Sequence, residues 1–420
     1  MKLSNINTFR AFRSRDYSLY LTGRAVSQFG AIMQQTAVVW VVYTITHSAF
    51  MLGVTTFAEQ FPLFLLSLFG GVAADRYSRY RIVNITQIAS MVQAVLLAVL
   101  ILTHHYVVWE ILALSVLLGI INAFDIPARQ AMIHDVVYED GDLASAVSLS
   151  ASTASLSRLI APALTGIILV KWGAGICFLI NAASFGGIIV SLLFMSRPKN
   201  AKIYRSDKKV FAELAEGFVY IRRTPAIGLI MLMLAIMGLL VLPYNTLLPV
   251  FAKIVFQGDA ATFGYITSFI GAGSIAGTIV LASLKKNAPH RKILLGFSVV
   301  LSVSLIVFAM ISSFTLAMII AVFVGFGTVA QFTTSNIIVQ SESAPQMRGK
   351  VISILLMAMF GTLPLGSVIV GAASQRAGAP ATLLAEGVLG LVIVLIFYYL
   401  MKNQLRRKDT PRVDNPNFNS

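Results

Sequence analysis

Residues 70–81 read GGVAADRYSRYR and join an apolar stretch near 49–73 to another near 82–103. The same alternation continues along the chain, with apolar runs of about 20 residues, the length that a helix needs to cross a hydrocarbon core of about 30 Å. Over 420 residues the chain is 57% hydrophobic and 12% charged, with a mean hydropathy of +0.82. A water-facing surface needs more charge than that. The sequence therefore predicts a membrane protein with many spans.

A sliding hydropathy window predicts twelve spans in two groups of six. The first six lie near 17–45, 49–73, 82–103, 107–131, 143–170 and 174–195. The second six lie near 226–250, 261–284, 292–312, 315–339, 351–375 and 382–401. We expect four units: an N-terminal bundle at 1–195, a linker at 196–225, a C-terminal bundle at 226–401 and a tail at 402–420. Within the linker, apolar side chains at helical spacing over 210–223 predict an interfacial amphipathic helix.

The basic residues indicate the orientation. Of the 32 Lys and Arg residues, 27 fall in the N-terminus, the even-numbered connections and the C-terminal tail. The positive-inside rule then predicts that both termini are cytoplasmic. Contact of these basic segments with anionic lipid accounts for the net charge of +15, so no nucleic-acid partner is expected.

The two groups of spans resemble each other weakly at an offset of about 205 residues. Ala144 to Ser148 enters the fifth predicted span much as Gly349 to Ser353 enters the eleventh. Internal repeats of this kind are common in transporters. We therefore expect an all-α membrane protein whose twelve transmembrane helices form two pseudo-symmetric six-helix bundles around a central path.

The 70–81 connection resembles the signature loop of the major facilitator superfamily, G-x-x-x-D-R-x-G-R-R/K. Gly71, Asp75, Arg76, Arg79 and Arg81 match the pattern, whereas Ser78 replaces the usual glycine. A glycine permits close helix approach, and the carboxylate and guanidinium groups can form a charged latch. A plain basic loop is the alternative. The resemblance implies the major facilitator fold.

Further motifs resemble the branch that holds the enterobactin exporter and macrolide efflux proteins. They read FDIPARQA at 124–131, SRLIAPALTG at 157–166, LLPVFA at 247–252 and MRGKV at 347–351. Ala161-Pro162 stands where antiporters of the superfamily have Gly-Pro. The resemblance implies export by exchange across the bacterial inner membrane.

Ionisable groups inside predicted spans are candidates for function because burying a charge there is costly. Glu59 and Arg158 are both expected near mid-depth and could pair. If so, the proton affinity of Glu59 would depend on conformation, which is what proton coupling requires. A permanent structural bridge from Glu59 to Arg158 or Arg24 is the equal alternative.

Asp125 lies near the predicted cytoplasmic end of the fourth span, on one face with Asn122 and Arg129. In related transporters an acid here pairs with the loop arginine and holds the cytoplasmic side closed. By resemblance we assign Asp125 and Arg79 to such a gate, together with Gly71, Asp75, Arg76 and Arg129. A static salt bridge at the helix end is the simpler alternative.

The superfamily arrangement implies a cavity lined by spans 1, 4, 7 and 10, which carry several polar side chains. Any one of these side chains could instead bond a neighbouring helix. Taken together they predict a polar binding pocket, in which Arg24 would favour an anionic solute. The candidate substrate-binding residues are Arg24, Gln28, Gln35, Asn122, Tyr244, Asn245, Gln331 and Asn336.

Several chemistries are excluded or not expected. No G-x-x-x-x-G-K-[ST] motif occurs, so ATP does not drive the protein directly, and no nucleophile elbow indicates an enzyme. The single cysteine, Cys177, excludes a cysteine-based metal site, and we expect no metal and no cofactor. We predict a monomeric secondary exporter of a siderophore-like or drug-like solute, driven by the proton gradient. A lysophospholipid transporter and a non-transporting sensor or assembly protein remain alternatives.

Overall fold

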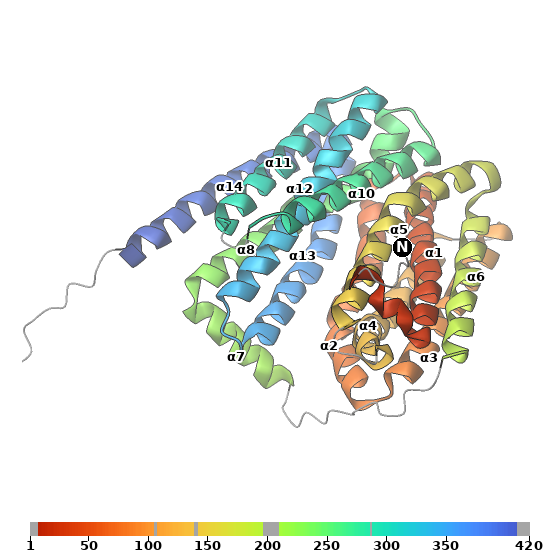
Figure 1. Ribbon diagram of the computed structural model, residues 1–420. Coiled ribbons are helices and arrows are strands. Elements are labelled where there is room, and N and C mark those ends of the chain that lie inside the picture. Colours follow the sequence, from red (N-terminus) through yellow and green to blue (C-terminus); the bar gives the residue numbers. More distant parts are fainter. Residues whose placement is uncertain (1–6, 105–106, 138–141, 196–209, 286–287, 410–420) are drawn as a thin grey trace, which may run out of the picture.

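The computed structural model describes residues 7–104, 107–137, 142–195, 210–285 and 288–409. These residues form helices and no strands, and twelve of the helices are long and apolar enough to cross a membrane (Figure 1). The predicted all-α fold with twelve spans is therefore confirmed. Residues 196–209 of the predicted linker and 410–420 of the predicted tail lie outside the described residues.

The helices follow the predicted order, with one exception in the seventh span. The first half comprises η2 (Asn7–Arg13), α1 (Arg15–Thr46), α2 (Ala49–Arg76), α3 (Arg79–Leu102), α4 (Val108–Val136), α5 (Leu143–Trp172) and α6 (Ala174–Leu193). Helix α7 (Val210–Arg223) precedes the second half. The second half comprises α8 (Pro225–Leu240), η4 (Leu242–Leu247), α9 (Leu248–Val250), η5 (Phe251–Val255), α10 (Ala260–Ala282), α11 (His290–Met310), α12 (Phe314–Glu342), α13 (Arg348–Ala377) and α14 (Ala379–Asp409).

The internal repeat is most exact at the end of each half. Gly173 separates α5 from α6, and Gly378 separates α13 from α14, with φ angles of +80° and +83°. Glycine adopts this region at no steric cost, whereas other residues are strained there. Because the two glycines are 205 positions apart, α6 and α14 begin at equivalent positions.

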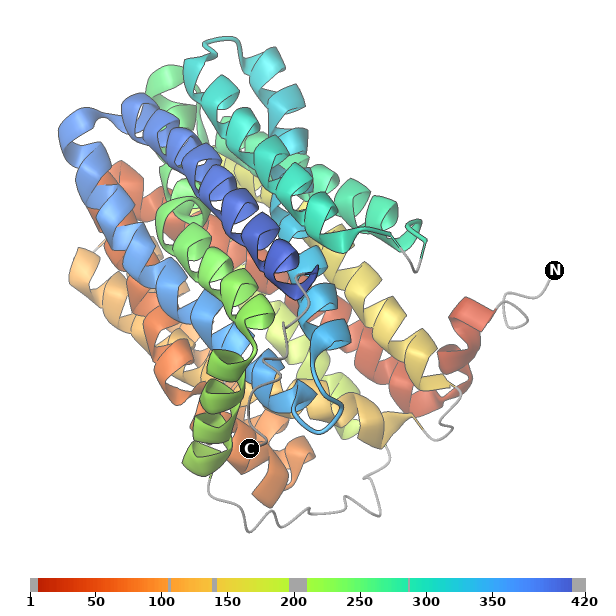
Figure 2. The ribbon, with the colours of Figure 1, turned by 90° about the vertical axis from the view of Figure 1, so that its left-hand side faces the viewer.

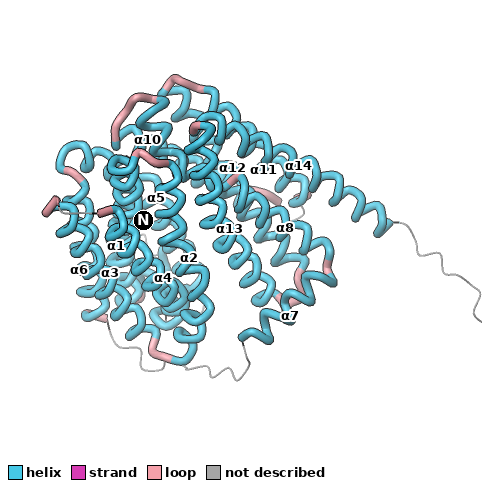
Figure 3. Tube along the Cα trace, turned by 180° about the vertical axis from the view of Figure 1, so that it is seen from behind, coloured by secondary structure: helices cyan, strands magenta, loops and turns pink. Residues whose placement is uncertain are grey.

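The two bundles sit side by side (Figure 1). We call the side that holds the connection between α2 and α3 the basic side, and the opposite side the far side. Helix α2 packs against α13, and α5 packs against α10. The ribbons of α2 and α13 meet toward the far side and diverge toward the basic side (Figures 1 and 3).

Glycines in the far half allow the bundles to approach closely. A Cβ atom at Gly53 of α2 would lie 2.2 Å from the carbonyl oxygen of Ser367 of α13. On the other helix pair, a Cβ at Gly264 of α10 would lie 2.3 Å from the carbonyl oxygen of Pro162 of α5. Real Cβ atoms do not come within 3.0 Å of such a neighbour. The far-side contact between the bundles therefore depends on these glycines.

A polar contact closes the far end of the α2–α13 pair. The side chain of Ser48 caps α2, and its hydroxyl donates to Gln375 Oε1 at 3.1 Å. The backbone N–H of Ala49 donates to the same oxygen at 3.1 Å. One glutamine side chain of the C-terminal bundle thus binds the first turn of α2 in the N-terminal bundle.

Helix α7 runs along the basic side of the C-terminal bundle (Figure 2). Its Glu216 pairs with Lys350 of α13, and the hydroxyl of its Tyr220 accepts a hydrogen bond from the N–H of Ala344 at 3.0 Å. The side chain of Phe218 is 54% exposed. The helix is therefore attached to the protein on one face, while the other presents apolar surface.

Candidate functional site

A cavity of about 430 Å³ lies between the two bundles, close to the far-side contacts. It is lined by residues of α1, α2, α5, η4, α10 and α13, with Leu248 of α9. The sequence analysis expected spans 1, 4, 7 and 10 to line the cavity. Of these four, spans 1 and 7 do so. The polar side chains of the lining are Gln28, Gln35, Thr36, Thr56, Gln60, Arg158, Asn245, Thr246, Thr267, Ser274 and Ser367.

Arg158 is the charged group of this cavity. Among the described residues that line it, only Arg158 carries a formal charge, and its side chain is exposed. The helix that bears it is held against the other bundle, because a Cβ atom at Gly271 of α10 would lie 2.6 Å from the Arg158 carbonyl oxygen. A cation on the wall of a cavity attracts anionic groups.

Three of the predicted binding residues line the cavity: Gln28, Gln35 and Asn245. Asn122 is half-buried outside this lining, and Asn336 accepts a hydrogen bond from Gln340 Nε2 at 2.8 Å. The remaining candidates of spans 7 and 10, Tyr244 and Gln331, are buried outside the cavity lining. Tyr244 is 2% exposed and Gln331 is 1% exposed.

The seventh span is broken, which the hydropathy pattern does not reveal. The α-helix α8 ends at Leu240, and the chain continues as the 3-10 turn η4, a short α9 and a π turn. Pro243 and Pro249 each lack the N–H that a continuous helix needs. The break turns Pro243, Asn245 and Thr246 toward the cavity. Non-helical backbone at membrane depth is tolerated where it lines such a cavity.

Glu59 and Arg158 do not pair. No ion pair joins the described side chain of Glu59 to Arg158 or to Arg24. Glu59 is half-buried in α2, where its carbonyl oxygen would lie 2.1 Å from a Cβ at Gly119 of α4. The next residue, Gln60, lines the cavity, and its Oε1 is buried without a hydrogen-bond partner.

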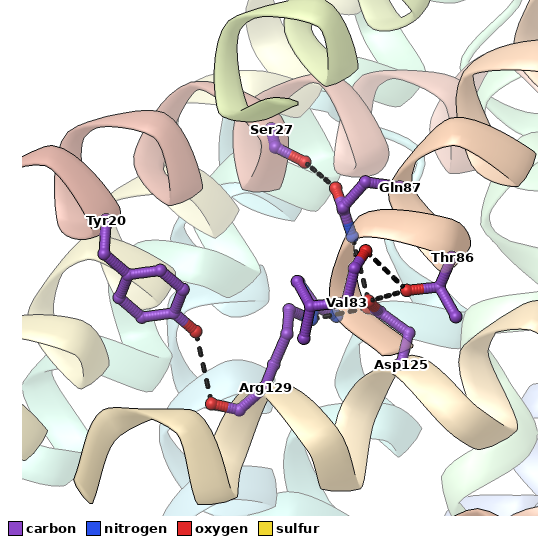
Figure 4. Close-up of polar contacts among 7 residues, drawn as sticks. All are labelled: Tyr20, Ser27, Val83, Thr86, Gln87, Asp125 and Arg129. Atoms are coloured by element: carbon purple, nitrogen blue, oxygen red, sulfur yellow. Dashed lines mark hydrogen bonds and ion pairs between the residues drawn. The ribbon is translucent and has the colours of Figure 1, made fainter. Parts of the chain in front are cut away.

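Asp125 is the centre of a buried network inside the N-terminal bundle (Figure 4). Its Oδ1 accepts hydrogen bonds from Thr86 Oγ1 at 2.7 Å and from Gln87 Nε2 at 2.9 Å. Its Oδ2 lies 2.5 Å from Arg129 Nε, one turn along α4. Ser27 of α1 donates to Gln87 Oε1 at 3.3 Å. The network therefore joins α1, α3 and α4, and its charge is paired and hydrogen-bonded as burial requires.

Arg24 lies in α1 beside this network and outside the cavity lining. It follows Tyr20 by one turn, and Tyr20 donates its hydroxyl to the Arg129 carbonyl oxygen at 3.2 Å. The Nη1 of Arg24 is buried and has no hydrogen-bond partner. In this conformation Arg158, rather than Arg24, presents positive charge to the cavity.

The expected pair of Arg79 with Asp125 is not formed. Arg79 Nη1 instead lies 2.9 Å from Asp135 Oδ1, near the end of α4, and its Nε donates to the carbonyl oxygen of Ala74 at 3.3 Å. Asp125 and Asp135 are ten residues apart, or about 15 Å along a helix. The connection between α2 and α3 lies beside the basic end of α4, so Arg79 reaches Asp135 and not Asp125. Asp75 and Arg76 are exposed.

The C-terminal bundle holds an equivalent pair. Arg291 at the start of α11 forms a bidentate bond to Glu342 at the end of α12, with Nη2 at 2.8 Å from both carboxylate oxygens. Arg79 and Asp135 occupy the matching ends of α3 and α4. Each half therefore has one arginine that ties the third helix of the bundle to the basic end of the fourth.

Gly71 is not a close-packing position, because a Cβ there would meet nothing within 4 Å. The close approach occurs at Gly70, where a Cβ would lie 1.9 Å from the Ala123 carbonyl oxygen of α4. In the described part of the chain, no three His, Cys, Asp or Glu side chains gather as a metal site would require.

Sequence reasoning missed one ionisable group within the spans. Glu386 lies in α14, is 2% exposed, and both of its carboxylate oxygens lack hydrogen-bond partners. The cost of burying a charge in an apolar run applies to Glu386 as it does to Glu59, although Glu386 lies only four residues inside its predicted span and not near mid-depth. The signal was therefore present in the sequence.

Comparison with known proteins assigns this chain to a family. The model of the transmembrane secretion effector family matches residues 6–417. The staphyloferrin A transporter of Staphylococcus aureus is 27% identical, over 93% of this chain and 95% of that protein. Macrolide efflux protein A of Streptococcus pyogenes is 21% identical, over 96% and 99%.

Solved structures show the same fold. A bacterial homologue of the human lysosomal transporter Spinster superposes with a TM-score of 0.73 at 14% identity, covering 94% of this chain and 98% of that one. A POT family transporter superposes with a TM-score of 0.72 at 12% identity, covering 93% and 96%. These relatives are transporters and not enzymes. The chain belongs to the transmembrane secretion effector family of the major facilitator superfamily.

Proposed function

We propose that the protein exports a small amphipathic solute across the bacterial inner membrane by alternating access, in exchange for protons. The observation that carries this proposal is the cavity between two bundles that touch on the far side and diverge on the basic side. The excess of basic residues supports a cytoplasmic position for the basic side. A rocking motion of the bundles would then expose the same cavity to the outside.

An anionic, siderophore-like solute fits the cavity best. Arg158 supplies the cation, and Gln28, Gln35 and Asn245 supply polar groups that can bind carboxylates and hydroxyls. The similarity to a staphyloferrin A transporter over nearly the whole chain supports the same class of substrate.

A drug-like solute is the second candidate, because part of the lining is apolar. Leu248, Phe263 and Ile270 face the same cavity, and pockets for drug-sized molecules are mostly apolar with a few polar groups. The similarity to macrolide efflux protein A supports this reading.

The coupling proton is proposed to bind Glu59. Its carboxyl group has no ion-pair partner to hold it permanently ionised, and its neighbour Gln60 lines the cavity. Substrate and proton would therefore bind at adjacent positions of α2, where each can influence the other.

The test uses everted vesicles that contain the overproduced protein and carry an imposed pH gradient, with a fluorescent dye that reports the luminal pH. Staphyloferrin A and erythromycin serve as probes. We expect staphyloferrin A to dissipate the gradient in vesicles with the protein and not in empty ones. Absence of proton movement with both probes contradicts the proposal and favours a non-transporting role or a lipid substrate.

The role of Arg158 is tested in the same vesicles. Arg158→Gln is expected to raise the KM for staphyloferrin A by about 10- to 150-fold, since a charge-assisted hydrogen bond contributes about 1.5–3 kcal/mol. Arg376→Gln is the matched control, because Arg376 is exposed in the last turn of α13, outside the cavity lining. Equal KM values for both variants would remove Arg158 from the binding site.

A further inference from the structure

Glu386 occupies a position whose counterpart in the first half is hydrogen-bonded. It is the eighth residue of α14, as Asn181 is the eighth residue of α6, and the two are 205 positions apart. Asn181 Nδ2 donates to Gln34 Oε1 at 2.8 Å, and Asn181 accepts from Ser184 Oγ at 3.2 Å. Glu386 has no equivalent partner: both oxygens are buried and unbonded.

The surroundings of Glu386 are set by the residues that share its helix face. A Cβ at Gly387 would lie 2.8 Å from the Ser302 carbonyl oxygen of α11, and one at Gly390 would lie 3.6 Å from Val241 Cγ1. This face of α14 therefore packs between α11 and the break in span 7, beside α8 (Figure 2). Helix α14 also contacts η4, the turn that carries Tyr244.

The charged and titratable groups of the neighbouring elements lie elsewhere. Within η4 the only one is Tyr244, and α8 has none. The others lie at helix ends: His290, Arg291 and Lys292 on α11, and Arg348, Lys350 and Arg376 on α13. The α11 group is ten or more residues, or about 15 Å, from Ser302. No ion pair to Glu386 is formed within the described residues.

The turn η4 separates Glu386 from the central cavity. On one side Pro243, Asn245 and Thr246 line that cavity. On the other side Tyr244 points into the C-terminal bundle, where its hydroxyl lies 3.2 Å from Thr328 Oγ1. Thr328 donates its own proton to the Val324 carbonyl oxygen at 2.8 Å, so Tyr244 is the donor to Thr328. A solute that displaces η4 would therefore also move the turn that packs against α14, the helix that carries Glu386.

We propose that Glu386 is a second proton-binding site, which is neutral while η4 has the conformation seen here and releases its proton when a solute in the cavity displaces η4. A carboxylate without a partner is strongly disfavoured in this apolar surrounding. After displacement, Tyr244 or water entering from the cavity can bond to the carboxylate, and the proton passes to that water. This inference rests on the proposed proton antiport.

Two measurements on the full-length protein test the site. Infrared difference spectra across a pH titration, without solute, should contain the C=O stretch of a protonated carboxyl group that disappears in Glu386→Gln. Glu110→Gln, which changes an exposed glutamate in the first turn of α4, should leave that band intact. Glu386→Asp should keep a carboxyl band with a shifted titration midpoint. A band that persists in this variant shows that changes at position 386 do not simply unfold the protein.

The second measurement is proton release into a weakly buffered detergent solution when staphyloferrin A is added. Glu386→Gln should reduce the number of protons released per protein, and Tyr244→Phe should shift the pH at which release is half-maximal. If Glu386→Gln leaves both the infrared band and the proton release unchanged, the inference is overturned. If the band titrates but no probe releases protons from the unaltered protein, the site stands and the proposed antiport fails.

Discussion

A methyl group added at Gly264 is expected to disfavour the far-closed conformation. In the structure, a Cβ at Gly264 would lie 2.3 Å from the Pro162 carbonyl oxygen in the opposite bundle, and at least 3.0 Å is needed. The α5 and α10 backbones must therefore separate by about 0.7 Å at this point. Overpacking of this kind costs about 1–3 kcal/mol. If the cost falls only on the far-closed conformation, Gly264→Ala shifts the equilibrium about 5- to 150-fold toward the far-open one.

The assay measures the far-side contact directly. Spin labels on Ser48→Cys and Gln375→Cys, in a Cys177→Ser background, report the separation of residues whose side chains are 3.1 Å apart in this structure. Gly264→Ala should increase the population at long distance. The control is Gly296→Ala in α11, where a Cβ meets nothing within 4 Å. An unchanged distance distribution in Gly264→Ala, with the protein folded, would refute the steric reasoning.

Three further predictions follow from the same geometry. Asp125→Ala leaves Arg129, which is half-buried, unpaired and should lower the free energy of unfolding by about 1–3 kcal/mol; thermal unfolding in detergent checks this, and a loss no larger than that of Asp75→Ala contradicts it. Glu59→Gln should abolish transport driven by the pH gradient while staphyloferrin A still binds in a titration calorimeter; normal pumping would exclude Glu59 as the coupling group. Gly273→Ala places a Cβ 1.8 Å from the Val322 carbonyl oxygen and should reduce the yield of folded protein in size-exclusion chromatography, and an unchanged yield argues against that close packing.

The number of spans and the two halves could be predicted from the sequence, because both depend on run length and spacing. The break in span 7 could not, since residues 241–255 are as apolar as a continuous helix. Pro243 and Pro249 were the only local signal. A hydropathy window averages over proline, whereas the helical hydrogen-bond pattern does not tolerate it.

The candidate site was predicted in part. Gln28 and Gln35 do line the cavity, because helical periodicity places both on one face of α1. Asn245 also lines it, but through the break in span 7. The partner of Arg79 was misplaced, since sequence spacing does not show how far along α4 the loop reaches. Arg158 was assigned to a buried pair, but α5 turns it into the cavity.

Two simultaneous distances test alternating access most directly. Spin labels at Ser48→Cys and Gln375→Cys report the far side, and labels at Ser148→Cys of α5 and Ser283→Cys, just beyond α10, report the basic side. The account predicts that a change in pH or addition of staphyloferrin A lengthens the far-side distance while it shortens the basic-side distance. Two distances that stay constant, or that lengthen together, would contradict export through a cavity that opens to one side at a time.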